Sequence, residues 1–135
     1  MLVALVPSGE DGFTERDRED IRRALRLADS EGGLPFSVYV GPLGDDSRAR
    51  ALTLHGALSD PGHGVLVAVD PGSRRVEVVT GPESKRYLDD RGATLGVLAM
   101  TTSLTAGDLA GGIVNGLRTL SEHARHPRVL HLDQP

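Results

Sequence analysis

The spacing of apolar residues predicts a helix in the first quarter of the chain. Between Ile21 and Ala28 these residues recur at i, i+3, i+4 and i+7, which is the stripe of a helix with one face on a core. Thr14 is a suitable N-cap, and Asp17 stands where the acid of a capping box belongs. The pair Gly32-Gly33 is a typical helix end. We therefore expect a helix that begins after Thr14 and ends at these glycines.

Three short segments carry strand patterns. Phe36–Val40 alternates apolar residues with Ser37 and Tyr39. Val65–Val69 is continuously apolar, as expected for a strand that is covered on both faces. Asp70-Pro71-Gly72-Ser73 is a strong turn signal, and Val76–Thr80 follows it as the returning strand. Together these segments predict a β-hairpin over Gly64–Thr80.

Further helices are predicted around this hairpin. Because a crossover between parallel strands is right-handed, the helix before Val65–Val69 should place that strand parallel to Phe36–Val40. A long helical region after the hairpin should break near Asp90–Gly92, and Asp108 is a suitable N-cap for the last helix. The glycines of Gly107–Gly112 should let that last helix pack closely against its neighbours. The expected helices run from Asp46 or Ser47 to Leu58, over Glu83–Ser103, and over Leu109–Ala124.

This order of elements predicts an α/β domain with a mixed central sheet of three to four strands flanked by helices. A chain of 135 residues is close to the commonest domain size, so we expect one domain over residues 13–124. Residues 1–12 would form an N-terminal arm or an edge strand, and residues 125–135 a C-terminal tail.

Composition narrows the classes of function. The absence of Cys excludes disulfides and thiolate chemistry. The net charge is −4, Lys85 is the only lysine, and two Phe, two Tyr and no Trp leave few rings for stacking bases, so nucleic-acid binding is not expected. No apolar run reaches the length of about 20 residues that a membrane span needs. Met1–Val6 has no basic start and is too short for the apolar part of a signal peptide, so we expect a cytoplasmic location.

Histidines do not form an evident catalytic set. His55 lies on the apolar stripe of the second predicted helix, which favours a hydrogen-bonded core residue over a catalytic one. His123 and His126 are three residues apart at the end of the last helix, where a solvated helix terminus is the simpler interpretation than a metal site. The motifs G-x-x-x-x-G-K-[ST], G-x-S-x-G and H-E-x-x-H are all absent.

One edge of the sheet is the best place for a site. The loop that enters a hairpin and the loop that leaves it lie at the same edge, and here both loops are polar. Carboxylates are the ligands that Ca²⁺ and Mg²⁺ prefer, and the amides near Glu83 could bind an anion. The alternative is that these are ordinary turn and cap residues. The binding candidates are Gly81, Glu83, Ser84 and Arg91, and the candidate metal ligands are Asp60, Asp89 and Asp90.

Three segments resemble the TPM domain family. They are FSVYVG at 36–41, GVLVAVDPGSRRVEVVTG at 64–81 and GDLAGGIVNGLRTL at 107–120, and the resemblance extends over about residues 13–124. The chain is still more similar to an uncharacterised actinobacterial family, domain of unknown function 5130. This resemblance implies a three-layer sandwich with a central sheet between helices.

The resemblance also implies two classes of function. Some TPM proteins are acid phosphatases, some bind calcium, and others act in the assembly of membrane complexes. Their acidic site corresponds to Asp60 and to Asp89 or Asp90 here. The favoured hypothesis is a non-catalytic binding or assembly module that acts on a protein partner or on itself. The alternative is a phosphatase that holds calcium or magnesium at these aspartates.

Overall fold

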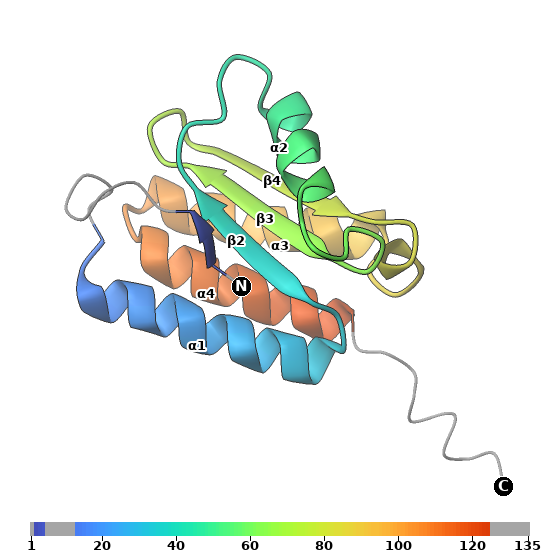
Figure 1. Ribbon diagram of the computed structural model, residues 1–135. Helices are drawn as coiled ribbons and strands as arrows, with labels where there is room; N and C mark the ends of the chain where they lie inside the picture. Colours follow the sequence, from blue (N-terminus) through green and yellow to red (C-terminus); the bar gives the residue numbers. More distant parts are fainter. Residues whose placement is uncertain (1, 5–12, 125–135) are drawn as a thin grey trace, which may run out of the picture.

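Figure 1 shows the computed structural model, which describes residues 2–4 and 13–124. The expected C-terminal tail and His126 lie outside the described residues, as does most of the expected N-terminal arm. Four strands and four α-helices, with one short 3-10 helix, make up the described part. They are β1 (Leu2–Ala4), α1 (Glu15–Gly32), β2 (Phe36–Val40), α2 (Ser47–Gly56), β3 (Val65–Asp70), β4 (Arg75–Thr80), η1 (Ser84–Arg86), α3 (Asp90–Thr105) and α4 (Leu109–His123).

The strands form one mixed sheet in the order β1-β2-β3-β4. β2 lies parallel to β3, with Phe36 opposite Val65, as the crossover through α2 predicts. β3 and β4 form the predicted antiparallel hairpin, in which Val65 is opposite Thr80. β1 pairs in parallel with β2 and is the outer strand on that side.

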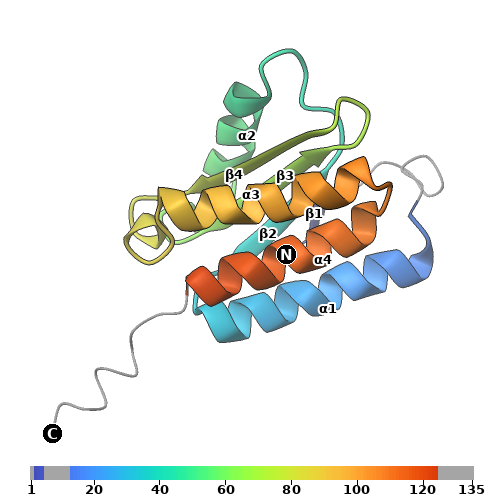
Figure 2. The same cartoon turned by 180° about the vertical axis from the view of Figure 1, so that it is seen from behind.

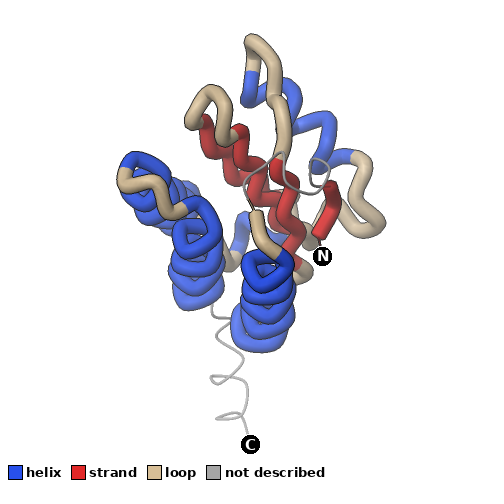
Figure 3. The backbone as a smooth tube through the Cα atoms, turned by 90° about the vertical axis from the view of Figure 1, so that its left-hand side faces the viewer, coloured by secondary structure: helices blue, strands red, loops and turns tan. Residues whose placement is uncertain are grey.

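Alternating side chains of the sheet build two cores. Val38 and Val67 face the large core, which is closed by α1, α3 and α4. Tyr39 and Leu66 face the opposite way, into a smaller core under α2. Figure 3 shows the resulting three layers, with α2 on one side of the sheet and the other helices beyond the opposite face. The predicted three-layer α/β sandwich is thus confirmed, and both cores are built mainly from aliphatic residues.

The local signals that start and end α1 are confirmed. The Thr14 hydroxyl accepts the amide of Asp17 at 3.0 Å, and the Asp17 carboxylate accepts the amide of Thr14 at 2.9 Å. Gly33 ends the helix with a φ of 75°, a left-handed conformation that costs glycine little. Asp108 caps α4 through the amide of Gly111, as the sequence predicts.

The break in the third helical region comes earlier than expected. The sequence places it near Asp90–Gly92, whereas the chain forms η1, passes through residues 87–89 and then starts α3 at Asp90. The reason is that the Asp89 carboxylate accepts the amide of Gly92 at 2.9 Å, so residues 90–92 form the first turn of the new helix.

α4 lies between α1 and α3 on the same face of the sheet, which Figures 1 and 2 show from opposite sides. Glycines make the α3–α4 contact close, as predicted for Gly107–Gly112. A Cβ atom on Gly112 would meet the Ser103 side chain, and one on Gly116 would overlap the Met100 side chain. In the described part of the chain, no helix combines the length and the apolar character that a membrane crossing requires.

Candidate functional site

The two loops at the open end of the hairpin are joined by backbone hydrogen bonds. The amides of Glu83 and Ser84 both donate to the carbonyl oxygen of Gly62, at 2.9 and 3.1 Å. The amide of Lys85 donates to the carbonyl oxygen of Gly81 at 2.9 Å. The loop that enters β3 and the loop that leaves β4 therefore meet at one edge, but these three amides are already used within the chain and do not face an anion.

A buried polar cluster lies under this edge. Ser84 is fully buried, and its hydroxyl accepts the amide of Gly81 at 2.8 Å and donates to the carbonyl oxygen of Gly64 at 3.2 Å. The Nε2 atom of His55 lies 3.0 Å from the same carbonyl oxygen. Because a carbonyl only accepts, this Nε2 carries a proton. His55 is thus the buried, hydrogen-bonded core residue that its position on the stripe predicts.

Gly81 has a packing role at the same edge. A Cβ atom at this position would overlap the backbone oxygens of Pro61 and Gly62. The close approach of the two loops therefore requires a residue without a side chain. Gly81 and Ser84, both binding candidates from the sequence, hold the edge together from inside.

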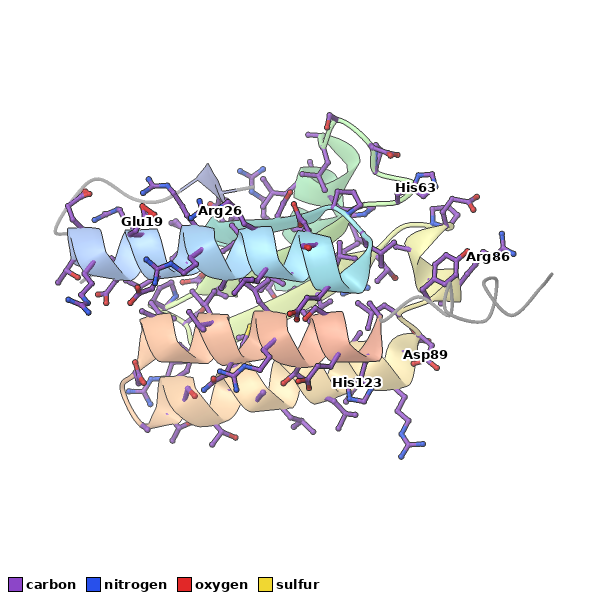
Figure 4. All side chains as sticks on the ribbon, turned by 90° about the horizontal axis from the view of Figure 1, so that it is seen from below. Glu19, Arg26, His63, Arg86, Asp89 and His123 are labelled. Atoms are coloured by element: carbon purple, nitrogen blue, oxygen red, sulfur yellow. The ribbon has the colours of Figure 1, made fainter. Side chains whose placement is uncertain are left out.

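The three candidate metal ligands have separate partners. Asp60 pairs with His63, whose Nδ1 lies 3.1 Å from the carboxylate. Asp89 caps α3, and the Asp90 carboxylate lies 3.7 Å from Nζ of Lys85. Figure 4 shows His63 and Asp89 at the same end of the molecule, on different loops. Across residues 2–4 and 13–124, no three His, Asp or Glu side chains form a group that could hold a metal ion.

The remaining candidates at this edge are exposed. Glu83 lies beside Arg86, with 3.6 Å between the carboxylate and the guanidinium, and Arg91 is on the exposed side of the first turn of α3. A small pocket of about 200 Å³ borders Asp60, between the start of β2 and the end of α2, and Pro35 and Leu58 are among its lining residues. This pocket is mainly apolar and receives only one of the candidate carboxylates.

A larger concave site lies elsewhere, along the groove between α1 and α4. It has a volume of about 650 Å³. The two helices run in the same direction, as Figure 2 shows, and Gly32 at the end of α1 lies against Ser121 near the end of α4. We call this site the α1–α4 groove.

The α1–α4 groove has an apolar floor and charged walls. Ala24, Ala28 and Val114 contribute to the floor, where they also pack on the large core. Leu27 rises from one side and is 54% exposed, although it is a large apolar side chain. The charged lining residues are Asp17, Asp20, Arg23, Glu31, Asp108, Arg118 and Glu122.

The α1–α4 groove was not predicted from the sequence, although a signal exists. On α4, Ala110, Val114 and Arg118 recur at intervals of four beside the core stripe, and on α1 Ala24, Leu27 and Glu31 do so at intervals of three and four. Such a second stripe marks a further helix surface. It identifies a groove only once α1 and α4 are known to lie side by side.

Two carboxyl groups outside both sites have shifted pKa values. Burial raises the pKa of Asp29, and a hydrogen bond from the amide of Phe36 offsets part of this effect. Burial also acts to raise the pKa of Asp70, but hydrogen bonds from Leu43, Ser73 and Gly72 outweigh it and leave that pKa below its ordinary value. Both groups fix loops to the sheet, since Asp29 accepts the first amide of β2 and Asp70 accepts the amide of Leu43.

Solved structures share this fold. The BA42 protein from the psychrophilic bacterium Bizionia argentinensis superimposes with a TM-score of 0.76 at 17% identity, over 87% of this chain and 84% of that protein. The N-terminal domain of the cg2496 protein from Corynebacterium glutamicum gives a TM-score of 0.66 at 16% identity, over 92% and 87% of the two chains. The N-terminal domain of a P. gingivalis protein gives 0.65 at 21% identity, over 84% and 78%. At these identities the likeness concerns the fold alone.

Sequence relatives come from an actinobacterium, as the resemblance predicts. Uncharacterised proteins of Mycobacterium tuberculosis strains CDC 1551 and H37Rv are each 36% identical to this chain over 86 residues. The match covers 64% of this chain and 52% of each relative, so the chain spans about half the length of the curated relatives it matches.

A family model covers most of the described fold. It matches residues 6–121, from before α1 to near the end of α4, and so includes the hairpin edge and both helices of the α1–α4 groove. The prediction made from the ordered sequence segments is therefore confirmed: this chain belongs to the family described as Domain of unknown function (DUF5130).

Proposed function

We propose that this domain is a non-catalytic binding module that takes a protein partner into the α1–α4 groove. The observation that carries the proposal is the groove itself, which has about 650 Å³ of volume between two parallel helices and an exposed Leu27 on its wall. Concave sites with an apolar floor and a few polar groups are the usual form of a binding site.

The side chains of the α1–α4 groove suit a protein surface. Ala24 and Ala28 are small, so the backbone of a partner could approach closely. Leu27 presents apolar area that is in water in the free domain, and burial of that area would favour binding by about 25 cal/mol per Å². An exposed aliphatic residue on the wall of a groove is therefore the expected anchor.

The hairpin edge supports a catalytic function less well than the α1–α4 groove supports binding. Ser84 and His55, the buried polar groups there, direct their hydrogen bonds to the backbone of the hairpin. Asp60, Asp89 and Asp90 each have a different partner. The calcium or magnesium site and the phosphatase activity predicted from these aspartates stay a prediction, and a separate assay tests it.

Crosslinking from inside the α1–α4 groove tests the binding proposal. A photo-crosslinking amino acid is placed at position 27 in the full chain, and at position 98 in a control, since Leu98 on α3 is 56% exposed and lies outside the groove. In mycobacterial cells we expect a discrete protein adduct from position 27 and none from position 98. The purified partner should then lose about tenfold or more in affinity with Leu27→Asp and keep it with Leu98→Asp. Equal adducts at both positions, or no discrete adduct at position 27, would overturn the proposal.

A phosphatase assay tests the alternative. The chain is incubated with p-nitrophenyl phosphate, with and without Ca²⁺ or Mg²⁺. Asp89→Asn is the informative variant, because Asn is as good an N-cap as Asp and should keep α3 intact while it removes the charge. Metal-dependent turnover that disappears in Asp89→Asn or Asp60→Asn would replace the binding module with the hydrolase. We expect no turnover above that of a heat-denatured sample.

A further inference from the structure

Two glutamates lie at the end of the α1–α4 groove where both helices end. Glu31 lies in the last turn of α1 and Glu122 in the last turn of α4, and both line the groove. A helix carries a partial negative charge at its C-terminus, so a carboxylate in its last turn is disfavoured. Because α1 and α4 are parallel, two such ends and two carboxylates lie at the same end of the groove. The last turn of α1 has no basic residue.

Two of the other three carboxylates of the groove already have roles in the fold. Asp17 belongs to the capping box of α1, and Asp108 caps α4. Arg23 lies near the middle of α1 and Arg118 lies one helical turn before Glu122, and both line the groove. The groove as a whole has five carboxylates and two arginines in its lining, so its net charge is negative. At the glutamate end, the partial negative charges of two helix C-termini add to the charges of the carboxylates.

This distribution of charge favours some classes of binding partner over others. A second copy bound groove to groove would bring two negative surfaces together, and like charges across an interface oppose binding. An anionic membrane or a nucleic acid would be repelled for the same reason. A partner with Lys or Arg side chains opposite Glu31 and Glu122 would instead complete two charge-assisted contacts.

The shape of the groove also indicates that the partner is helical. The 15 residues of α4, lying parallel to the 18 residues of α1, leave a furrow about 22 Å long, at 1.5 Å rise per residue. A third helix can lie in such a furrow, with its side chains between those of the two walls. Small floor residues such as Ala24 and Ala28 favour that close approach.

Resting on the binding function proposed above, we propose that the partner presents an amphipathic helix with a basic end. Its apolar face covers Leu27 and the floor of the groove, and its Lys or Arg side chains lie at Glu31 and Glu122. The recognition is thus a helix in a groove, with the register of the helix set by charge at one end.

The test uses the full chain and two fluorescent 16-residue peptides. Both peptides have the same leucine and alanine face; one has two arginines in its last turn and the other has two glutamates there. We expect the arginine peptide to bind, more tightly at low salt, and the glutamate peptide to bind at least about tenfold more weakly. The charge-reversed variant Glu31→Lys/Glu122→Lys should reverse this preference. It should also fold, because lysine at a helix C-terminus is favoured by the dipole.

A matched variant separates local from overall charge. Asp45→Lys/Glu19→Lys changes the net charge by the same amount at two exposed residues outside the α1–α4 groove. It should keep the preference for the arginine peptide, with a loss of less than about threefold at moderate salt. Equal weakening by both double variants would show that only the net charge matters and would overturn the inference.

The outcomes distinguish this inference from the function on which it rests. If Leu27→Asp weakens binding of the arginine peptide but the charge-reversed variant does not, the groove is the site, and the inference that its partner has a basic end is wrong. If the arginine peptide fails to bind up to about 1 mM at low salt, the basic helix is also wrong. If the arginine peptide binds and Leu27→Asp has no effect on it or on the crosslinked partner, the groove itself is not the site and the proposed function fails.

Discussion

The hydroxyl of Ser84 lies 3.2 Å from the carbonyl oxygen of Gly64, and this hydrogen bond joins the residue before β3 to the segment after β4. The same hydroxyl accepts the amide of Gly81 at 2.8 Å. One buried side chain thus connects the beginning and the end of the hairpin. Gly81 and Ser84, which the sequence indicates as binding candidates at this edge, are thus the residues that hold its two loops together.

Ser84→Ala should destabilise the domain by about 1 to 3 kcal/mol, because it leaves the buried amide of Gly81 without its acceptor. Urea denaturation measures this difference in the free energy of unfolding. Ser59→Ala is the control, since Ser59 is exposed and should change stability by less than about 0.5 kcal/mol. Equal stability of the two variants would contradict the structural role of Ser84.

His55→Leu should cost less than Ser84→Ala. Its Nε2 donates to the carbonyl oxygen of Gly64, which keeps the hydroxyl of Ser84 as a second donor after the substitution. The double variant removes both donors, so its loss should exceed the sum of the single losses by about 0.5 to 3 kcal/mol. Urea denaturation of the four proteins gives this coupling, and simple additivity would mean that the two donors act independently.

Gly81→Ala should destabilise the domain by about 2 to 3 kcal/mol, because the added Cβ overlaps the backbone of the Pro61-Gly62 loop and the two loops must separate. Gly56→Ala is the matched control, since a Cβ at the end of α2 meets no atom within 4 Å. Thermal unfolding should place the melting temperature of Gly56→Ala at or above that of the parent chain. A similar result for Gly81→Ala would show that the loops are not closely packed.

Helix caps and turns were predicted well, because local sequence signals determine them. Thr14 and Asp17 form their capping box whatever the rest of the chain does, and the turn after Asp70 places the hairpin. The side-chain directions at the hairpin edge do not follow from the sequence, because topology brings loops to one edge without fixing where their side chains point. Asp89 illustrates this, since its carboxylate turns back to cap α3.

The α1–α4 groove was not predicted because it depends on a contact between distant segments. Its lining comes from the first and last helices of the described chain. The sequence around Leu27 gives no sign that this side chain differs from other exposed residues. Only the packing of α4 between α1 and α3 makes that side chain part of a concave surface.

Asp70 should make stability depend on pH. Its carboxylate accepts the amides of Leu43 at 3.0 Å and of Gly72 at 3.0 Å, and its pKa in the folded chain lies below the ordinary value of 3.8. A lowered pKa stabilises the fold above that ordinary value, and this contribution disappears as the pH falls through the folded pKa. Asp70→Asn should therefore lose about 0.5 to 1 kcal/mol at pH 7, since solvent screens this partly exposed carboxylate, and should differ less from the parent chain as the pH falls below about 4.

Unfolding at several pH values measures this difference for Asp70→Asn. Asp45→Asn is the control, because Asp45 is an exposed loop residue on the same side of the sheet and should show no such trend. A difference between parent and Asp70→Asn that stays constant from pH 7 to pH 3 would mean that the ionised form of Asp70 does not hold the two loops.

Arg48 should protect the outer edge of the sheet. β4 is an edge strand, and its Val78 carbonyl oxygen accepts a hydrogen bond from Nη1 of Arg48 at 2.8 Å. The same guanidinium lies 3.4 Å from the carboxylate of Glu77, which keeps it over the strand. A charged side chain on an edge strand hinders pairing with another chain.

Arg48→Ala should therefore change the free energy of unfolding by only about 1 kcal/mol, since half-exposed ion pairs contribute little, but it should increase self-association. Sedimentation velocity over a range of protein concentrations measures this effect. Arg50→Ala removes the same charge from an exposed position on the same helix, α2, and should remain monodisperse under conditions where Arg48→Ala forms larger species. If both variants associate alike, the lost charge is responsible and Arg48 does not act through the edge of β4.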